Sequence, residues 1–329
     1  MYLDAMIQAV QDAMRLTESV RREAFENLGI DKMGAKKEIE PVTIADYGSQ
    51  AILCRAVQAH YPDDAVFAEE SGEQFQLLVA ADQQAYITQL VSTALGVTVT
   101  VEQIIEWLDY GKGRTAPCHW LFDPIDGTRG FVAGRHYAVG IALIEGDGVR
   151  GSIIGCPGYG TSVIKPYAED GAIFYAWEGK AYRIPTNGGT PEQVHVSSRT
   201  DPAEVVLMQS VERAHGDKSR KAQSYLHAGY ANSHLHELDS MEKYALIASG
   251  AVDVVLHIPN RPSTFNTWDH APGQALVEAA GGRVTNLDGS ALDMTQGAAI
   301  PDCKGLIISN GAVHDRFVAA VQKVMAEAN

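Results

Sequence analysis

The sequence lacks the features that mark several large classes of protein. It has only four cysteines in 329 residues, far apart and without a C-x-x-C pair, so neither a disulfide framework nor a zinc or redox dithiol site is predicted. No segment comes near the ~20 continuous apolar residues that cross a bilayer. The first residues include Asp4 and form no basic segment followed by an apolar run, so no signal peptide is predicted. We therefore expect a protein of the cytoplasm with no membrane partner.

Basic residues are also scarce. Lys and Arg together number 26 against 41 Asp and Glu, which gives a formal net charge of -15 at pH 7. Proteins that hold nucleic acid through its backbone need clustered Lys and Arg, so no nucleic-acid partner is predicted. A small phosphorylated molecule remains a fitting partner, because bound metal ions reverse the local field of an acidic site. The sequence leaves the oligomeric state open.

The apolar residues are numerous enough for a large core, and their pattern changes along the chain. Helical spacing predicts a long first helix that ends before Gly29. Strands dominate the middle of the chain, with a hairpin turn at Glu178-Gly179. Beyond a stretch rich in Gly and Pro, strands alternate with helices. We expect a mixed α/β (α+β) protein with an N-terminal α+β lobe over residues 1–185 and a C-terminal α/β lobe over residues 186–329.

The most informative segment follows a short apolar strand and reads D-P-I-D-G-T, residues 123–128. Its proline fixes its own φ and favours an extended conformation in the residue before it, so Asp123 and Asp126 leave the strand in a defined geometry. With the main-chain carbonyl of Ile125 they form an oxygen-only ligand set that suits Mg²⁺. Gly127 lets the backbone approach a ligand closely, and Thr128 offers a hydroxyl and an amide to phosphate or to a nucleophilic water. An Asp-Gly pair alone indicates only a turn, so the metal hypothesis depends on other acidic motifs.

Three further acids are candidates for the same site. Glu69 and Glu70 stand at the end of a short predicted strand, where paired acids are usually solvated surface. Asp269 is expected to begin a helix that has Pro272 in its first turn. There its carboxylate is able to serve both as an N-cap and as a metal ligand, because it has more than one lone pair to offer.

Hydrolysis also needs a group that positions the attacking water. Asp46, which follows Thr43 closely, is placed to orient the hydroxyl of Thr128 and through it the water. Two or more Mg²⁺ ions among the acids would lower the pKa of a bound water and neutralise charge on the transferred phosphoryl group. The motifs together predict hydrolysis of a phosphate monoester on a small metabolite without a covalent enzyme intermediate.

Four ordered motifs resemble the marks of the inositol monophosphatase superfamily and cover most of the chain. They are residues 41–46 (P-V-T-I-A-D), 69–71 (E-E-S), 120–128 (W-L-F-D-P-I-D-G-T) and 268–273 (W-D-H-A-P-G). The resemblance implies a two-lobed, layered αβαβα sandwich of the inositol monophosphatase and fructose bisphosphatase type. It also implies a Mg²⁺-dependent phosphatase that holds two or three ions.

Within the superfamily the chain is most similar to the 3′(2′),5′-bisphosphate nucleotidases of the salt-tolerance type. Residues 45–50 (A-D-Y-G-S-Q) and 127–131 (G-T-R-G-F) match their pattern, and the insert between Glu69 and Asp123 is long. The similarity implies removal of the 3′-phosphate from 3′-phosphoadenosine 5′-phosphate (PAP) to give AMP, with the phosphosulfate PAPS as a further substrate. It also implies a place in sulfur metabolism and sensitivity to Li⁺.

The resemblance assigns roles to individual residues. Asp46 and Thr128 are the expected water-activating pair. The expected metal ligands are Glu69, Asp123, Asp126, Asp269 and the carbonyl of Ile125. The expected substrate contacts are Gly127, Thr128, His215, Ser240, Lys243 and His257.

The chain departs from the nucleotidase pattern at three places, of which Ala68, in place of the Gly before the acidic pair, has little chemical weight. His257 stands where these enzymes have Arg, which weakens a fixed positive contact to phosphate at neutral pH. Residues 265–269 (F-N-T-W-D) lack the Lys of the corresponding motif. Two alternatives therefore stay open. One is a phosphatase of inositol phosphates or sugar bisphosphates with the same metal centre, and the other is a non-catalytic sensor of a phosphorylated metabolite.

Overall fold

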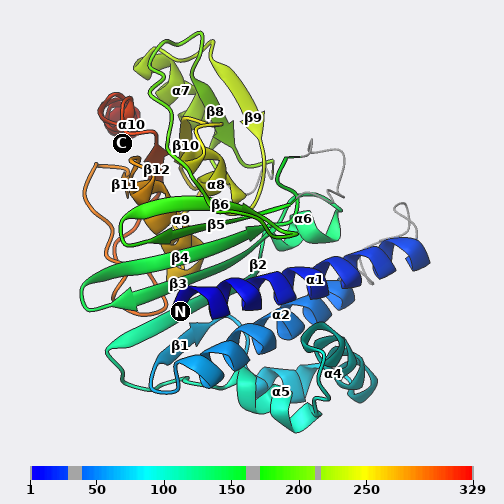
Figure 1. Cartoon of the computed structure of the whole chain (residues 1–329). Coiled ribbons are helices and arrows are strands. Elements are labelled where there is room, and N and C mark those ends of the chain that lie inside the picture. Colours follow the sequence, from blue (N-terminus) through cyan, green and yellow to red (C-terminus); the bar gives the residue numbers. More distant parts are fainter. Residues whose placement is uncertain (1, 29–38, 161–170, 212–215, 328–329) are drawn as a thin grey trace.

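The computed structural model describes residues 2–28, 39–160, 171–211 and 216–327 of the chain (Figure 1). Its helices are α1 (Tyr2–Leu28), α2 (Ile39–His60), α3 (Gly72–Leu78), α4 (Ala81–Leu95), α5 (Val101–Leu108), α6 (Thr128–Val132), α7 (Lys218–Ala228), α8 (Glu242–Ala248), α9 (Thr267–Ala279) and α10 (His314–Glu327). Its strands are β1 (Ala65–Ala68), β2 (Cys118–Asp126), β3 (Ala138–Glu145), β4 (Gly148–Cys156), β5 (Ala172–Trp177), β6 (Lys180–Pro185), β7 (Glu192–Gln193), β8 (Val206–Gln209), β9 (His234–Glu237), β10 (Val254–His257), β11 (Arg283–Asn286) and β12 (Leu306–Ser309). No helix in this part of the chain combines the length and the apolar character that crossing a bilayer requires.

The first sheet contains seven strands whose spatial order, β1 to β7, follows the chain. β1 and β2 are parallel, and α3, α4 and α5 lie between them in the sequence, because parallel neighbours need a long connection. Every later neighbouring pair is antiparallel. The turn between β5 and β6 is Glu178-Gly179, with φ of 51° and 72°, as a two-residue hairpin requires. The predicted hairpin is therefore confirmed.

The second sheet has the order β11-β12-β10-β8-β9. β8 runs parallel to both β10 and β9, whereas β12 is antiparallel to β10 and to β11. The carboxyl ends of β8 and β10 therefore lie at the same edge of the sheet. Open α/β sheets bind ligands at that edge, so the residues that follow these two strands are candidates for substrate contacts.

Helices and sheets alternate in five layers (Figure 1). α1 and α2 cover one face of the first sheet and share a core with it. α8 and α9 lie between the two sheets, and α7 and α10 cover the far face of the second sheet. The expected mixed, layered αβαβα fold is confirmed. β7 lies beyond residue 185 and still pairs with β6 of the first sheet, and the division into lobes over 1–185 and 186–329 stays a prediction.

The start of α9 differs from the prediction. The helix begins at Thr267 with Asn266 as its N-cap, so Asp269 lies within the first turn instead of at the cap. Pro272 consequently falls in the second turn. The cause is a tertiary contact that the local sequence does not show, because Asn266 forms a β-bridge with Ala299 and fixes the chain immediately before the helix.

Candidate active site

Residues 123–126 of the D-P-I-D-G-T segment form the end of β2, and residues 123–125 are buried. The Asp123 side chain is 3% exposed, and its Oδ1 accepts a hydrogen bond of 3.1 Å from the amide of Ile125. The pairing of β2 with β3 becomes irregular between Asp123 and Asp126, which separates these residues from the regular ladder. On the other side, the Ser49 hydroxyl of α2 donates to the Pro124 carbonyl over 3.0 Å. The segment is thus held by both β3 and α2.

Asp126 is tied to the segment that precedes α8. Its Oδ2 accepts a hydrogen bond from the amide of Met241. Gly127 has φ of +87°, and a Cβ at that position would lie 2.8 Å from the Cβ of Ser240. Ser240 itself has φ of +78°, a conformation that is uncommon for a residue other than glycine. The two turns pack so closely that a glycine is required at position 127.

Helix α2 positions the turn that carries Glu69 and Glu70. The amide nitrogen of the Gln50 side chain donates to the Glu70 carbonyl, and the Glu70 amide donates to Gln50 Oε1, both over 2.8 Å. Asp46 lies one turn earlier in the same helix and is 8% exposed. One helix therefore carries Asp46 and holds the two turns on which the other N-terminal acids lie.

The reciprocal pair of hydrogen bonds at Gln50 leads to a stability prediction. Replacing Gln50 with Ala leaves two partly buried main-chain groups of Glu70 without these partners, so the free energy of unfolding should fall by about 1–3 kcal/mol. Turnover should fall at least ~10-fold, because small misplacements of catalytic groups are costly. Urea unfolding and initial-rate kinetics measure the two effects. Gln89→Ala, at an exposed position of α4, is the control and should change neither.

Asp269 comes from the other half of the chain and meets the same group of acids. Asn266 donates a long hydrogen bond of 3.4 Å to its Oδ2, and Asp123 lies close enough to affect its pKa. Burial, followed by the charges of Asp126 and Glu69, raises the pKa of Asp269 to about 7. The structure therefore brings Asp269 to the acids of β2, as predicted.

The remaining acids show the same mutual repulsion. Burial and the charge of Asp126 raise the pKa of Asp123 well above its ordinary value, and burial and the charge of Glu70 do the same for Asp46. Burial raises the pKa of Asp126 to about 6, against the opposing effect of a nearby lysine. Desolvation, then the charges of Glu70 and Asp126, raise the pKa of Glu69 to about 7, although part of its side chain reaches solvent. Acids that perturb one another in this way are a cluster that a cation would stabilise.

The donor chemistry of this cluster fits Mg²⁺. Its atoms are carboxylate and carbonyl oxygens, which are the ligands of hard divalent cations. Among the described residues, no three His, Cys, Asp or Glu side chains converge on one point that would hold a metal ion. Mg²⁺ does not require such convergence, because it commonly takes one or two carboxylates and completes its shell with waters and substrate phosphate. The assignment of individual ligands stays a prediction.

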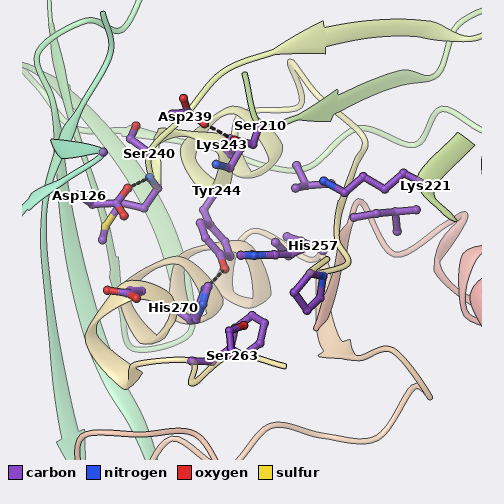
Figure 2. Close-up of a pocket in the computed structure, with 18 of the residues that line it drawn as sticks. Asp126, Ser210, Lys221, Asp239, Ser240, Lys243, Tyr244, His257, Ser263 and His270 are labelled. Atoms are coloured by element: carbon purple, nitrogen blue, oxygen red, sulfur yellow. Dashed lines mark hydrogen bonds between the residues drawn. The ribbon is translucent and has the colours of Figure 1, made fainter. Parts of the chain in front are cut away.

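A pocket of about 430 Å³ opens next to the acids and is lined by residues from both halves of the chain (Figure 2). Asp126 and Asp269 are among the residues that line it. Ser210, which follows β8, and His257, at the end of β10, lie at the sheet edge that the topology marks as a ligand-binding edge. The volume falls in the range of small-molecule sites.

The predicted substrate contacts are distributed unevenly around this pocket. Gly127, Ser240, Lys243 and His257 line it, whereas His215 lies outside the described residues. His257 belongs to an aromatic wall, with ring centroids 5.1 Å from Phe265 and 5.8 Å from His270. A packed imidazole stands at the place where the nucleotidase pattern has a fixed cation.

Thr128 differs from its predicted arrangement. Its hydroxyl donates to the Ile125 carbonyl over 3.3 Å, and within the described residues no hydrogen bond joins it to Asp46. Thr128 is exposed at the start of the short helix α6. Its role beside Asp46 in activating water stays a prediction.

Two cations of the pocket, Lys221 and Arg261, were not among the predicted site residues. Lys221 belongs to the hydrophilic segment K-S-R-K (218–221), and such a segment normally marks a solvated helix face. No local pattern distinguishes the one lysine that turns inward. Arg261 stands in a loop after β10, where only the tertiary fold reveals its place at the pocket.

The arrangement of these elements matches solved structures over nearly the whole chain. An IMPase from Thermotoga maritima has a TM-score of 0.62 at 20% sequence identity, with 99% of both chains covered. An inositol monophosphatase from Zymomonas mobilis has a TM-score of 0.60 at 18% identity, covering 96% of this chain and 97% of that one. The fold is thus the mixed α/β fold of the inositol monophosphatases.

The sequence itself establishes the family. Residues 3–326 match the inositol monophosphatase family, to which the chain belongs. It is accordingly a phosphomonoesterase of a metal-dependent phosphatase superfamily whose members typically use Mg²⁺. Two relatives, from Emericella nidulans (31% identity over 344 residues, covering 96% of each chain) and Oryza sativa (30% over 345 residues, covering 99% of this chain and 95% of the relative), are each named a 3′(2′),5′-bisphosphate nucleotidase.

Proposed function

We propose that this chain is a Mg²⁺-dependent 3′(2′),5′-bisphosphate nucleotidase that removes the 3′-phosphate of PAP to give AMP and also accepts PAPS. The observation that carries the proposal is the pocket itself, which is lined both by Asp126 and Asp269 of the acidic cluster and by the cations Lys221 and Arg261. A substrate with two phosphates needs two separate binding places in the pocket, one at the metal centre for the scissile phosphate and one at a cation for the other phosphate. The nucleotidase relatives at about 30% identity support the same substrate.

In this mechanism Glu69, Asp123, Asp126, Asp269 and the Ile125 carbonyl hold the Mg²⁺ ions, two or three in number. When bound, Mg²⁺ supplies a water of lowered pKa and neutralises charge on the phosphoryl group. The carboxylate of Asp46 and the hydroxyl of Thr128 orient the attacking water, which requires the hydroxyl to rotate away from Ile125. Ser240 and Lys243 hold the substrate beside Asp126, and the turn at Ser240 keeps the reacting groups aligned.

Substrate comparison tests this proposal. The purified protein with Mg²⁺ should hydrolyse PAP with kcat/KM at least ~10-fold above that for inositol monophosphate, inositol 1,4-bisphosphate and fructose 1,6-bisphosphate. A tenfold ratio corresponds to one extra well-made contact in the transition state. The replacement of a fixed cation by His257 favours the alternative of an inositol phosphate or sugar bisphosphate substrate. A higher kcat/KM on one of those compounds than on PAP would establish that alternative, and absence of turnover on all four would contradict both.

A further inference from the structure

Lys221 is a buried cation of the pocket to which the mechanism above assigns no specific contact with the substrate. It lies in the first turns of α7, and only 3% of the residue is exposed. The start of α7 is fixed, because the Asp217 carboxylate accepts a hydrogen bond of 3.0 Å from the Arg220 amide. The Asp217 amide in turn donates to the Ile258 carbonyl over 2.8 Å, which attaches the helix to the end of β10. The position of Lys221 is therefore set by the sheet edge at which the pocket opens.

The space that the ammonium occupies depends on a glycine. A Cβ at Gly216 would lie 2.4 Å from Lys221 Nζ and 2.9 Å from its Cε. The absence of a side chain at Gly216 thus lets the lysine lie against the loop and reach the pocket. In Figure 2, Lys221 points into the pocket from the side opposite Asp126, with Lys243 and Tyr244 between them.

The charge of Lys221 lacks a close anionic partner. Within the described residues, no ion pair or side-chain hydrogen bond involves its ammonium, whereas the neighbouring Lys218 pairs with Glu237 over 2.8 Å. Asp217 and Asp239 act on it only at longer range. Burial, then the charge of Lys243, lower the pKa of Lys221 to about 8. Burying an ammonium without an anionic partner costs desolvation free energy. An anionic group of a ligand bound beside Lys221 would offset that cost.

We infer that Lys221 binds a second anionic group, phosphate or sulfate, of a substrate whose scissile phosphate lies at Asp126 and Asp269. Lys221 is then a specificity-determining residue that favours bisphosphorylated substrates over monophosphates. The inference rests on the proposed phosphatase chemistry of the pocket, but not on adenine as part of the substrate. Arg261, which is exposed and also lines the pocket, adds a second positive charge to it.

The test compares substrates that differ only in the second phosphate. Lys221→Met keeps most of the side-chain volume without the charge, and Lys221→Gln is a second neutral variant. Both should raise KM for PAP about 10- to 100-fold with kcat within about threefold of the parent, since a charge-assisted hydrogen bond is lost. The KM for adenosine 3′-phosphate should stay unchanged. The control Lys218→Gln, at a lysine paired on the surface, should leave both substrates unaffected.

Product inhibition gives an independent readout. AMP carries only the second phosphate, so its inhibition constant should rise in both Lys221 variants in step with KM for PAP, while inhibition by adenosine stays constant. Equal losses on PAP and adenosine 3′-phosphate, or no loss on either, would overturn the inference. If the parent enzyme does not hydrolyse PAP, the proposed function fails, and the comparison is made with inositol 1,4-bisphosphate and inositol 1-phosphate. A selective loss on the bisphosphate then still supports Lys221, and its absence refutes it.

Discussion

Replacing Asp126 with Asn is expected to lower kcat by about 10³-fold or more while the protein stays folded. The carboxylate is proposed to hold Mg²⁺ that supplies several kcal/mol of charge stabilisation, and each 1.36 kcal/mol corresponds to a factor of ten in rate. Asparagine keeps an oxygen that accepts the hydrogen bond from the Met241 amide, so the turn before α8 retains its anchor. It removes the negative charge, which is the property that the metal requires.

Stability should change in the opposite sense to activity in this variant. Burial raises the pKa of Asp126 to about 6, and the charge of Asp126 in turn raises the pKa values of Asp123, Glu69 and Asp269, so a neutral side chain relieves repulsion among these acids. Thermal unfolding without metal should therefore show a melting temperature at or above that of the parent. The control Asp147→Asn, at an exposed turn between β3 and β4, should change neither property. Loss of folded structure in Asp126→Asn would mean that Asp126 is structural, and near-normal turnover would remove it from the metal centre.

The sequence predicted those parts of the site that depend on local chemistry. Pro124 makes the backbone geometry at Asp123 and Asp126 predictable, because proline restricts its own φ and the conformation of the residue before it. Glu178-Gly179 predicts its hairpin for a similar reason, since few residue pairs adopt positive φ twice. In both cases one or two residues determine the backbone, whatever surrounds them.

Other parts of the site were not predictable because they depend on contacts between distant segments. Asp269 is moved into the first turn of α9 by the bridge between Asn266 and Ala299, which lie more than 30 residues apart. The inward orientation of Lys221 depends on a glycine at position 216 and on the attachment of Asp217 to β10. Nothing in the local sequence of this hydrophilic helix indicates that Lys221 is buried and faces the pocket.

The cluster of acids also predicts a large loss of phosphatase activity when a chelator removes the metal. Five carboxylates from α2, the turn after β1, the end of β2 and the start of α9 perturb one another's pKa values. Excess EDTA should therefore abolish phosphatase activity, and added Mg²⁺ should restore it fully. Full activity in the presence of excess chelator would refute the metal mechanism.

Metal binding should also appear in stability, independently of turnover. An ion that binds the folded chain and not the unfolded chain adds RT ln(1 + [L]/Kd), about 2.7 kcal/mol at 100 times Kd. Titration of the EDTA-treated protein with Mg²⁺ should thus raise its melting temperature, and the increase should be much smaller in Asp126→Asn. An equal increase in both proteins would place the stabilising ion elsewhere. Because repulsion among the acids opposes folding until a cation is bound, the same carboxylates that destabilise the metal-free fold provide the affinity on which catalysis depends.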